Sequence, residues 1–554
     1  MKKKHKHKHS SNKRSSQNKS SKTAAKEKLH PHQPILEVIS SSSHALPPEV
    51  DSYHQGIAHP HTHVHTAFKI ILLTGILLIS LTIFASQIEM PFIPLTLKFK
   101  SFNTLFAPSS ENKLADSLIT KYLTDSTGSN SPDTNAGSGV NFVNHQNSGV
   151  YALDKFFDAV VRESSLKTIR ISHYGDSQIE GDRVTSQLRN KFHSLFGGTG
   201  LGFIPLTDLA SSISYDRTST QNWMKYNVFS HKLRRGENYG ISGSAFKFLD
   251  FAVEQKVSEK NPISPDTTQA PEDSSEVPVA KTSRYFESGD VSIQFSSGHS
   301  IAKAFLLFGK VKSRLHLVIS GDDSKIIFDG NLFDNQNYRD NELNKLDIPF
   351  ESVKKKLSIH ITGDKSTLFY GLYADGSTGV EIDNYGIRGH SGDGLLLLND
   401  EFTKLQISYL DTRLVIFQYG GNAVPYIHNE QGKDYLMKTY SSVIDKLKRL
   451  LPNASFLIVG VGDMAQSSNG EHQSYPGVKI VREGLKELAK KYNCAFFDLY
   501  NLMGGENSVL KWNEKGLAAK DGHFSLGGEK IVANEISNAI ANEFKLYKQR
   551  HGIK

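Results

Sequence analysis

Apolar residues recur along the chain with two alternating periods from about residue 151 onward. Leu153, Phe156 and Val160 fall at helical spacing, and a strand-like apolar run at 168–174 follows them. The alternation resumes later, with strands expected at 379–385, 413–419, 455–461 and 494–499 and helices at 433–451, 476–492 and 525–548. Alternating strands and helices predict a doubly wound α/β fold, in which helices cover both faces of a five-stranded parallel sheet.

The interval 203–375 has a different pattern. Its apolar runs are short, rich in β-branched and aromatic residues and separated by turn residues, as in VSIQFSS, RLHLVIS and KLSIHIT. Several such runs in succession predict a β-sandwich. Because they interrupt the α/β pattern, we expect an inserted β-sandwich domain at 203–375 between two parts of the α/β core, 146–202 and 376–548. A low-complexity stretch at 256–283 is expected to be a surface loop of this domain.

The chain that precedes the α/β core is polar except for one apolar segment. Residues 1–66 hold few large apolar side chains and many Lys, His and Ser residues, so we expect a disordered tail. The 19 residues from Ile70 to Ile88 carry no charge, which is close to the ~20 needed to cross a bilayer. They predict a transmembrane helix at 67–89, followed by an extracytoplasmic spacer at 90–145 that is rich in small polar residues.

The basic residues of the tail set the expected orientation. Lys and Arg lie on the upstream side of the apolar segment, so the positive-inside rule places the N-terminus in the cytoplasm. We therefore expect a single-pass protein of the cell membrane whose catalytic or binding domain lies outside the cytoplasm. The histidines of the tail leave two interpretations open, a metal-binding tract and a solvated polar segment, of which the second is the simpler.

The net charge narrows the range of partners. The chain of 554 residues has a formal charge of +8, and its first 66 residues hold 11 Lys or Arg against four acidic residues. The tail thus carries +7, and the remainder is almost neutral, so nucleic-acid binding by the folded part is not expected. The single cysteine, Cys494, excludes an internal disulfide framework and any all-cysteine metal site.

Polar residues follow the predicted parallel strands, at the edge of the sheet where open α/β sheets bind ligands. Ser177 follows the first strand in YGDSQ, and Asn422 follows the third in GGN. Asp521 and His523 precede the last helix in KDGHFS, and the turn after the second strand, GIRGHSGDG, offers Gly389 beside two other glycines, Gly386 and Gly392. A serine, a histidine and nearby hydrogen-bond donors are what acyl transfer by a serine nucleophile requires.

These motifs, in this order, resemble the SGNH (GDSL-type) hydrolase superfamily over roughly residues 150–548. The resemblance is greatest to envelope carbohydrate esterases of the peptidoglycan O-acetylesterase type that carry an inserted β-sandwich. It implies that Ser177 is the nucleophile, His523 the general base and Asp521 the group that orients the imidazole. It further implies an oxyanion hole formed by the backbone N–H of Ser177 and Gly389 and the side-chain amide of Asn422, and no cofactor or metal ion.

The chain departs from the family pattern at two positions. The family usually separates the Asp and His of its last motif by two residues, whereas Gly522 alone separates Asp521 from His523. A backbone carbonyl or another acid therefore remains an alternative for orienting His523. Ala423 also stands where an Asp commonly follows the Asn.

The predicted activity is removal of acyl groups, most simply O-acetyl groups, from a cell-envelope or extracellular polysaccharide such as peptidoglycan. Two alternatives remain open at this stage. An O-acetyltransferase would use the same serine and histidine, with a sugar hydroxyl in place of water. A glycan-binding module without catalytic activity is the second, although the retained Ser, Asn and His argue against it.

Overall fold

The computed structural model describes residues 141–248 and 288–553, except 297, 300, 350–354, 364–365 and 469, together with two short strands nearer the N-terminus. The chain divides into two compact units, residues 1–99 and 100–554. In the first, β1 (Gln87–Glu89) pairs antiparallel with β2 (Thr96–Lys98), and Ile88 lies opposite Leu97.

The predicted tail at 1–66 and most of the predicted membrane segment at 67–89 lie outside the described residues. The last three residues of that segment form β1, a strand where the sequence predicted a helix. Within the described part of the chain, no helix is both long and apolar enough to cross a membrane. The loop expected at 256–283 and most of the spacer at 90–145 also lie outside the described residues.

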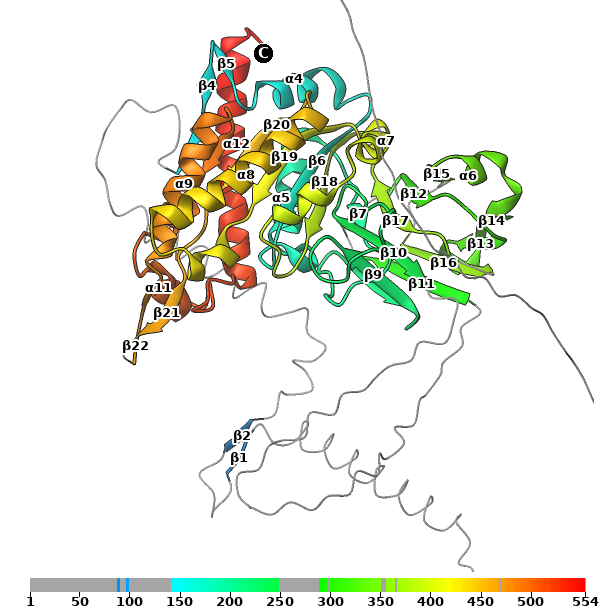
Figure 1. Cartoon of the computed structure of the whole chain (residues 1–554), viewed down its shortest axis with the longest axis horizontal. Helices are drawn as coiled ribbons and strands as arrows, with labels where there is room; N and C mark the ends of the chain where they lie inside the picture. The colour runs from blue at the N-terminus through cyan, green and yellow to red at the C-terminus, as the bar shows by residue number, and fades with distance from the viewer. Residues whose placement is uncertain are drawn as a thin grey trace, which may run out of the picture. The chain divides into compact units, whose positions relative to one another are not determined.

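A six-stranded sheet forms the centre of the second unit, in the order β18–β6–β19–β20–β23–β3 (Figure 1). Its strands are β18 (Gly379–Gly386), β6 (Thr168–Gly175), β19 (Thr412–Gln418), β20 (Ser455–Val459), β23 (Ala495–Phe497) and β3 (Phe142–Asn144). The first five run parallel, so the doubly wound parallel sheet expected from the sequence is present. β6, which comes first of the parallel strands in the sequence, lies between β18 and β19 in the sheet.

The sixth strand corrects the predicted fold. β3 pairs antiparallel with β23 at the edge of the sheet, although residues 142–144 were expected to belong to the spacer. Three residues are too few to display a strand period, which explains why the pattern did not reveal this strand. The parallel sheet of the expected fold class therefore gains one antiparallel edge strand.

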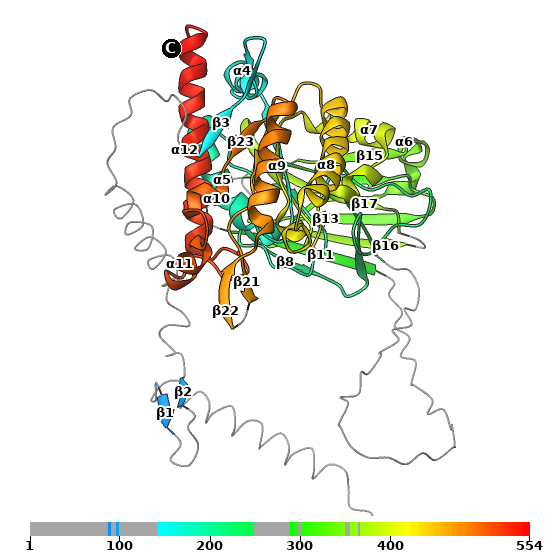
Figure 2. The ribbon, with the colours of Figure 1, turned by 60° about the vertical axis from the view of Figure 1, so that its left-hand side comes forward.

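Alternation along each strand sends apolar side chains to both faces of the sheet. The α-helices of the described residues are α4 (Asp154–Glu163), α5 (Arg183–Phe196), α6 (Gln336–Asp340), α7 (Asp400–Leu410), α8 (Glu430–Leu450), α9 (Gly477–Lys491), α10 (Leu499–Met503), α11 (Ser508–Glu514) and α12 (Leu526–Arg550). In β19, Leu414 and Ile416 pack in one cluster with residues of α4, α5 and α12, whereas Val415 and Phe417 pack in a second cluster with residues of α8 and α9. Figure 2 shows α8 and α9 side by side on their face of the sheet.

Two antiparallel sheets occupy residues 202–375 (Figure 1). One runs in the order β15 (Leu343–Pro349), β12 (Lys303–Gly309), β17 (Phe369–Asp375), β10 (Ser244–Phe248) and β9 (Trp223–Asn227), with β7 (Gly202–Ile204) also paired to β17. The other runs in the order β14 (Ile326–Asn331), β13 (Leu315–Ser320), β16 (Lys356–Gly363), β11 (Ser288–Phe295) and β8 (Tyr215–Ser219). That residues 203–375 form a domain of their own stays a prediction.

The antiparallel sheets and the parallel sheet share buried contacts. The hydroxyl of Tyr174, in β6, donates to the backbone carbonyl of Ile241 at 3.0 Å. The guanidinium of Arg170, also in β6, forms buried ion pairs with Asp375 at the end of β17 and with Asp383 of β18. Because one apolar cluster runs through both parts, the two are packed as a continuous interior.

Candidate active site

The carboxyl ends of the parallel strands bring the predicted site residues together. Ser177 lies two residues beyond the end of β6, Gly389 follows β18, and Asn422 follows β19. Asp521 and His523 lie in the loop before α12. All five line one of two neighbouring hollows that meet at Ser177.

A hydrogen bond joins the serine to the histidine. Ser177 Oγ lies 2.8 Å from His523 Nε2, although the two residues are 346 positions apart in the sequence. A hydroxyl in this position can pass its proton to the imidazole as it attacks a carbonyl. The pair therefore has the geometry that a nucleophile and its general base require.

The other imidazole nitrogen faces a carboxylate on the same loop. Asp521 Oδ2 lies 3.1 Å from His523 Nδ1, and Asp521 Oδ1 accepts a hydrogen bond from the backbone N–H of His523 at 3.1 Å. Partial burial opposes ionisation of Asp521, but these bonds from His523 outweigh it and lower the pKa of the carboxyl. The one-residue separation thus still brings the carboxylate to the ring.

The backbone of Gly522 explains how so short a separation suffices. Its φ angle of +88° lies in the left-handed region, which residues with a Cβ seldom adopt. A Cβ at this position would lie 3.1 Å from the Cβ of Met464 and 3.2 Å from the carbonyl oxygen of Asp463. The resulting turn brings the side chains on both sides of Gly522 together.

The neighbours of Ser177 hold this loop against the serine. The Gln178 side chain donates from Nε2 to the carbonyl oxygen of Gly522 at 2.8 Å. Arg183, in the first turn of α5, donates to the carbonyl oxygen of Phe524 and pairs with Glu529 at 2.6 Å. Neither residue was predicted from the sequence to belong to the site, although Gln178 is part of the motif YGDSQ.

Two backbone N–H groups near Ser177 can receive a developing negative charge. Within the described residues, the N–H groups of Ser177 and Gly389 donate no intramolecular hydrogen bond. Gly389 has a φ of +73°, and a Cβ there would approach the Phe229 ring to 3.1 Å. Of the three glycines that the sequence offered, Gly389 lines the hollow beside Ser177, whereas Gly386 ends β18 and Gly392 packs on the Tyr419 ring.

The amide of Asn422 is held by two acceptors. Its Nδ2 donates to Asp176 Oδ2 at 3.2 Å and to the backbone carbonyl of His390 at 3.3 Å. Both bonds are long for N–H···O contacts, so an oxyanion beside Ser177 can compete for one of the two hydrogens. Asp176 and the carbonyl of His390 thus fix the direction in which the amide points.

Asp176 is a buried carboxyl that sequence reasoning missed. It lies directly before Ser177, and burial raises its pKa to about 6, although the backbone N–H of Gln178 donates to Oδ1 at 3.0 Å and partly opposes this shift. Its position in the motif YGDSQ was visible, but nothing in the sequence indicated that its side chain turns inward to Asn422.

Two hollows meet at Ser177, Asn422 and His523. The smaller, a pocket of about 210 Å³, is lined beside the serine by apolar residues that include Pro425, Val461 and Met464. The larger is an open groove of about 800 Å³ that extends over Gly389 and the segment around Leu209. A small acyl group fits the first, and a longer chain needs the second.

Other polar residues noted in the sequence do not point to further chemistry. His173 and His390 are buried, and burial lowers the pKa of each imidazole to about 4. Asp463 lines the smaller pocket, but its carboxylate accepts hydrogen bonds from Ser474 at 2.6 Å and from the N–H of Val509 at 3.0 Å. Among the described residues, no cluster of three or more His, Cys, Asp or Glu side chains could hold a metal ion.

Comparison with known proteins identifies the fold. No protein-family model and no curated protein matches the chain. A solved structure of a peptidoglycan O-acetylesterase is similar with a TM-score of 0.52 and 18% identity, over 73% of this chain and 99% of that chain. Two acetylxylan esterases, AlAXEase and Axe2 from Geobacillus stearothermophilus, each cover 29% of this chain with TM-scores of 0.23 and identities of 21% and 19%.

Of these three similarities, only the first extends over enough of the chain to describe its fold. It shows that the α/β sheet and the antiparallel sheets of this chain together have the fold of that esterase structure. At 18% identity, the similarity leaves the chemistry to be argued from the site itself.

Proposed function

We propose that this chain is a serine esterase that removes O-acetyl groups from a polysaccharide of the cell envelope. The observation that carries the proposal is the alignment of Ser177, His523 and Asp521: Ser177 Oγ is hydrogen-bonded to His523 Nε2 at 2.8 Å, and Asp521 Oδ2 lies 3.1 Å from His523 Nδ1. It is formed at the carboxyl edge of an α/β sheet, beside a groove open to a polymer.

The first step forms an acyl-enzyme. His523 Nε2 takes the proton of Ser177 Oγ as this oxygen bonds to the ester carbonyl carbon, and Asp521 stabilises the imidazolium that results. The tetrahedral intermediate then collapses, the bond to the sugar oxygen breaks, and the imidazolium returns its proton to that oxygen. The deacetylated sugar leaves with Ser177 acetylated.

The negative charge of the tetrahedral intermediate is received by the backbone N–H of Ser177, the backbone N–H of Gly389 and the amide of Asn422. Loss of one such donor costs typically ~10²–10³ in turnover. In the second step, His523 takes a proton from water, the water oxygen attacks the acetyl carbonyl, and acetate leaves as Ser177 recovers its proton. The chain's own residues perform every step.

The substrate class rests on the similarity to a peptidoglycan O-acetylesterase structure and on the two hollows at Ser177. An acetyl group enters the smaller pocket while the sugar chain lies along the groove. O-acetylated peptidoglycan is therefore the first substrate to test.

We also propose a location for this activity. The uncharged run from Ile70 to Ile88 and the basic residues before it favour a membrane-anchored chain with the esterase outside the cytoplasm. In intact spheroplasts, external protease should then remove residues 90–554. If that part survives until the membrane is broken, the proposed orientation is wrong.

The enzyme assay uses the full chain and its Ser177→Ala variant. Release of acetate from O-acetylated peptidoglycan and from 4-nitrophenyl acetate should fall by at least ~10³-fold in the variant. Mass spectrometry of the products with an added oligosaccharide distinguishes hydrolysis from transfer, because transfer would move the acetyl group to the oligosaccharide. Equal rates for the two proteins would refute a role of Ser177 as nucleophile.

A further inference from the structure

One segment of the antiparallel region reaches the groove beside Ser177. Residues 205–214 connect β7 to β8, and their Leu209, Ala210, Ser211 and Ile213 line the groove. Leu209 is fully exposed, and Ile213 is 49% exposed. Apolar side chains that remain in water at the rim of a groove favour an occupant with apolar faces.

An arginine from the edge of one antiparallel sheet fixes the shape of this segment. Arg217 lies in β8, the edge strand of its sheet, and donates to the backbone carbonyls of Pro205, Asp208 and Ala210 at 3.3, 3.1 and 3.2 Å. A planar guanidinium can hold three carbonyls at once because its five N–H donors have a fixed geometry.

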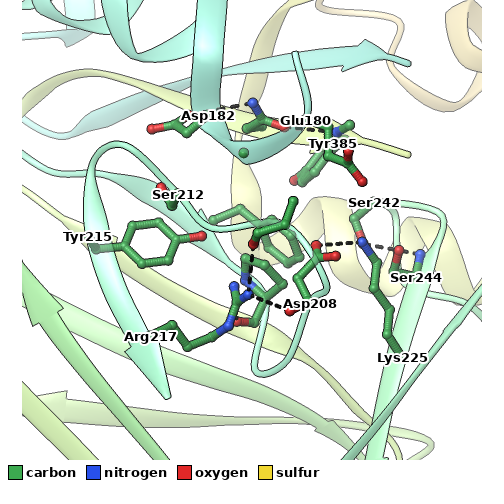
Figure 3. Close-up of a pocket in the computed structure, with 16 residues that line it drawn as sticks. Glu180, Asp182, Asp208, Ser212, Tyr215, Arg217, Lys225, Ser242, Ser244 and Tyr385 are labelled. Atoms are coloured by element: carbon green, nitrogen blue, oxygen red, sulfur yellow. Dashed lines mark hydrogen bonds and ion pairs between the residues drawn. The ribbon is translucent and has the colours of Figure 1, made fainter. Parts of the chain in front are cut away.

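A lysine from the edge of the other antiparallel sheet holds the same segment. Lys225 lies in β9, and its Nζ is 2.7 Å from Asp208 Oδ2 in an ion pair that is largely buried. Figure 3 shows Arg217 and Lys225 approaching Asp208 from opposite sides of the small hollow beneath the segment. Both sheets therefore determine where Leu209 lies.

The far end of the segment is attached to the residues that follow the nucleophile. The N–H of Ile213 donates to the carbonyl of Gly181 at 3.1 Å, and the hydroxyl of Ser214 donates to Asp182. Asp182 is itself held by two bonds from Arg189, at 2.6 and 2.9 Å. The segment is thus fixed at both ends relative to Ser177.

We propose that residues 205–214 form one wall of the groove that binds the polysaccharide chain, with Leu209 and Ile213 in contact with the apolar faces of its sugar rings. Arg217 and Lys225 are positioning residues that hold this wall. The inference rests on the proposed esterase function and makes the antiparallel sheets a determinant of polymer recognition. A small ester that lacks a sugar chain does not reach the wall.

The first test replaces an exposed side chain, so that folding is not at risk. Leu209→Ser is compared with Leu166→Ser, since Leu166 is 78% exposed and lies outside the groove. With O-acetylated peptidoglycan, Leu209→Ser should raise KM about five- to tenfold, as expected for the loss of one apolar contact. Its effect with 4-nitrophenyl acetate should be at least fivefold smaller, and Leu166→Ser should match the wild type with both substrates.

The second test addresses the positioning residues. Lys225→Met and Arg217→Met should raise KM for O-acetylated peptidoglycan more than they lower kcat, and Lys225→Arg should restore KM because it can still pair with Asp208. Thermal unfolding of each variant identifies loss of folded protein. The proposal would be overturned if kcat/KM of the folded variants fell equally with O-acetylated peptidoglycan and 4-nitrophenyl acetate, or if KM for the polymer did not change.

A third measurement separates this proposal from the esterase function. The full chain with Ser177→Ala is sedimented with insoluble O-acetylated peptidoglycan, and Leu209→Ser or Leu166→Ser is added to it. If the double variant with Leu209→Ser binds more weakly and the double variant with Leu166→Ser does not, the wall is supported even if the wild type hydrolyses no ester. Equal binding of the two double variants rejects the wall whether or not the wild type is an esterase.

Discussion

At the scale of single residues, the backbone of Gly522 determines whether Asp521 can serve His523. The left-handed turn at Gly522 lets one carboxylate contact both the Nδ1 and the backbone N–H of the histidine. Orientation of the ring is therefore achieved within three consecutive residues. The same arrangement makes the site sensitive to a single added methyl group.

Two substitutions distinguish the effect of the turn from the effect of the carboxylate. Asp521→Asn keeps an oxygen that can accept the His523 N–H but removes the charge opposite the ring, so kcat should fall about 10²–10⁴-fold with the fold intact. Gly522→Ala keeps the carboxylate but strains a φ of +88°, and it should lower kcat while also lowering the melting temperature. Steady-state kinetics and thermal unfolding measure both effects, and unchanged kcat in Asp521→Asn would mean that another group orients His523.

The positions of individual site residues were largely predictable from the sequence, but their contacts were not. Ser177 and Asn422 follow strands that an apolar pattern reveals, and parallel strands bring such positions to one edge. His523 precedes the last helix, which its apolar pattern also reveals. The role of Gly522 depends on a φ angle, and that of Asp176 on the direction of a side chain. Neither property leaves a periodic signal in the sequence.

At the scale of elements, Asp176 joins the loops that follow two adjacent strands. It belongs to the loop after β6, and its carboxylate holds Asn422 of the loop after β19 at 3.2 Å. Burial raises the pKa of Asp176 from 3.8 to about 6, so its ionisation at neutral pH opposes folding. The connection between the loops is thus made at the expense of stability.

This cost predicts a pH dependence of stability. In the unfolded chain Asp176 loses its proton near 3.8, whereas in the folded chain it does so near 6, so the folded state binds more protons between these values. The contribution of Asp176 to the free energy of unfolding is therefore most favourable below the unfolded pKa. It is lost as the pH rises through about 6, and the total loss is about 3 kcal/mol at most. Asp176→Asn should therefore lose less stability between about pH 4 and pH 7 than the wild type does.

Denaturant unfolding at both pH values measures this difference. Asp216→Asn, which replaces an exposed carboxylate in β8, is the control. This variant should lose as much unfolding free energy between the two pH values as the wild type does. Turnover of Asp176→Asn should fall at the same time, because an amide cannot accept as a carboxylate does from Asn422. If Asp176→Asn loses as much unfolding free energy between the two pH values as the wild type, the raised pKa of Asp176 is contradicted.

Element boundaries show which features of the fold can be predicted from sequence. The predicted helices at 433–451 and 476–492 agree closely with α8 and α9, because their apolar residues repeat over several turns. The edge strand β3 was missed because its three residues show no period. The pairing of β6 between β18 and β19 follows from packing of the whole sheet rather than from any local pattern.

At the scale of the whole molecule, the parallel and antiparallel sheets have a common interior. The Phe203 ring of β7 lies 5.2 Å from the Tyr385 ring of β18, and the Tyr373 hydroxyl of β17 lies 3.3 Å from that of Tyr385. Arg170 also depends on Asp375 for one of its two buried partners. From these contacts we predict that neither part is stable without the other, even if residues 203–375 are counted as a domain.

Removal of residues 203–375 should therefore prevent folding of the remainder. The deletion would expose apolar side chains of β6 and β18 and leave Arg170 with one carboxylate, and loss of one partner of a buried pair typically costs about 3–5 kcal/mol. Soluble yield and near-ultraviolet circular dichroism should both be lost, whereas Leu209→Ser should retain both. A soluble, cooperatively unfolding deletion variant would show that the two parts are independent.

The distance in sequence between Ser177 and His523 has a consequence for the timing of activity during synthesis. The two residues are 346 positions apart, and chains grow at roughly 5–20 residues per second, so the serine is made about 17–70 s before the histidine. During that interval the growing chain holds a nucleophile without its base. If the proposed esterase function is correct, a nascent or truncated chain that lacks His523 should not hydrolyse esters, and activity should begin only after the loop before α12 has been made and folded.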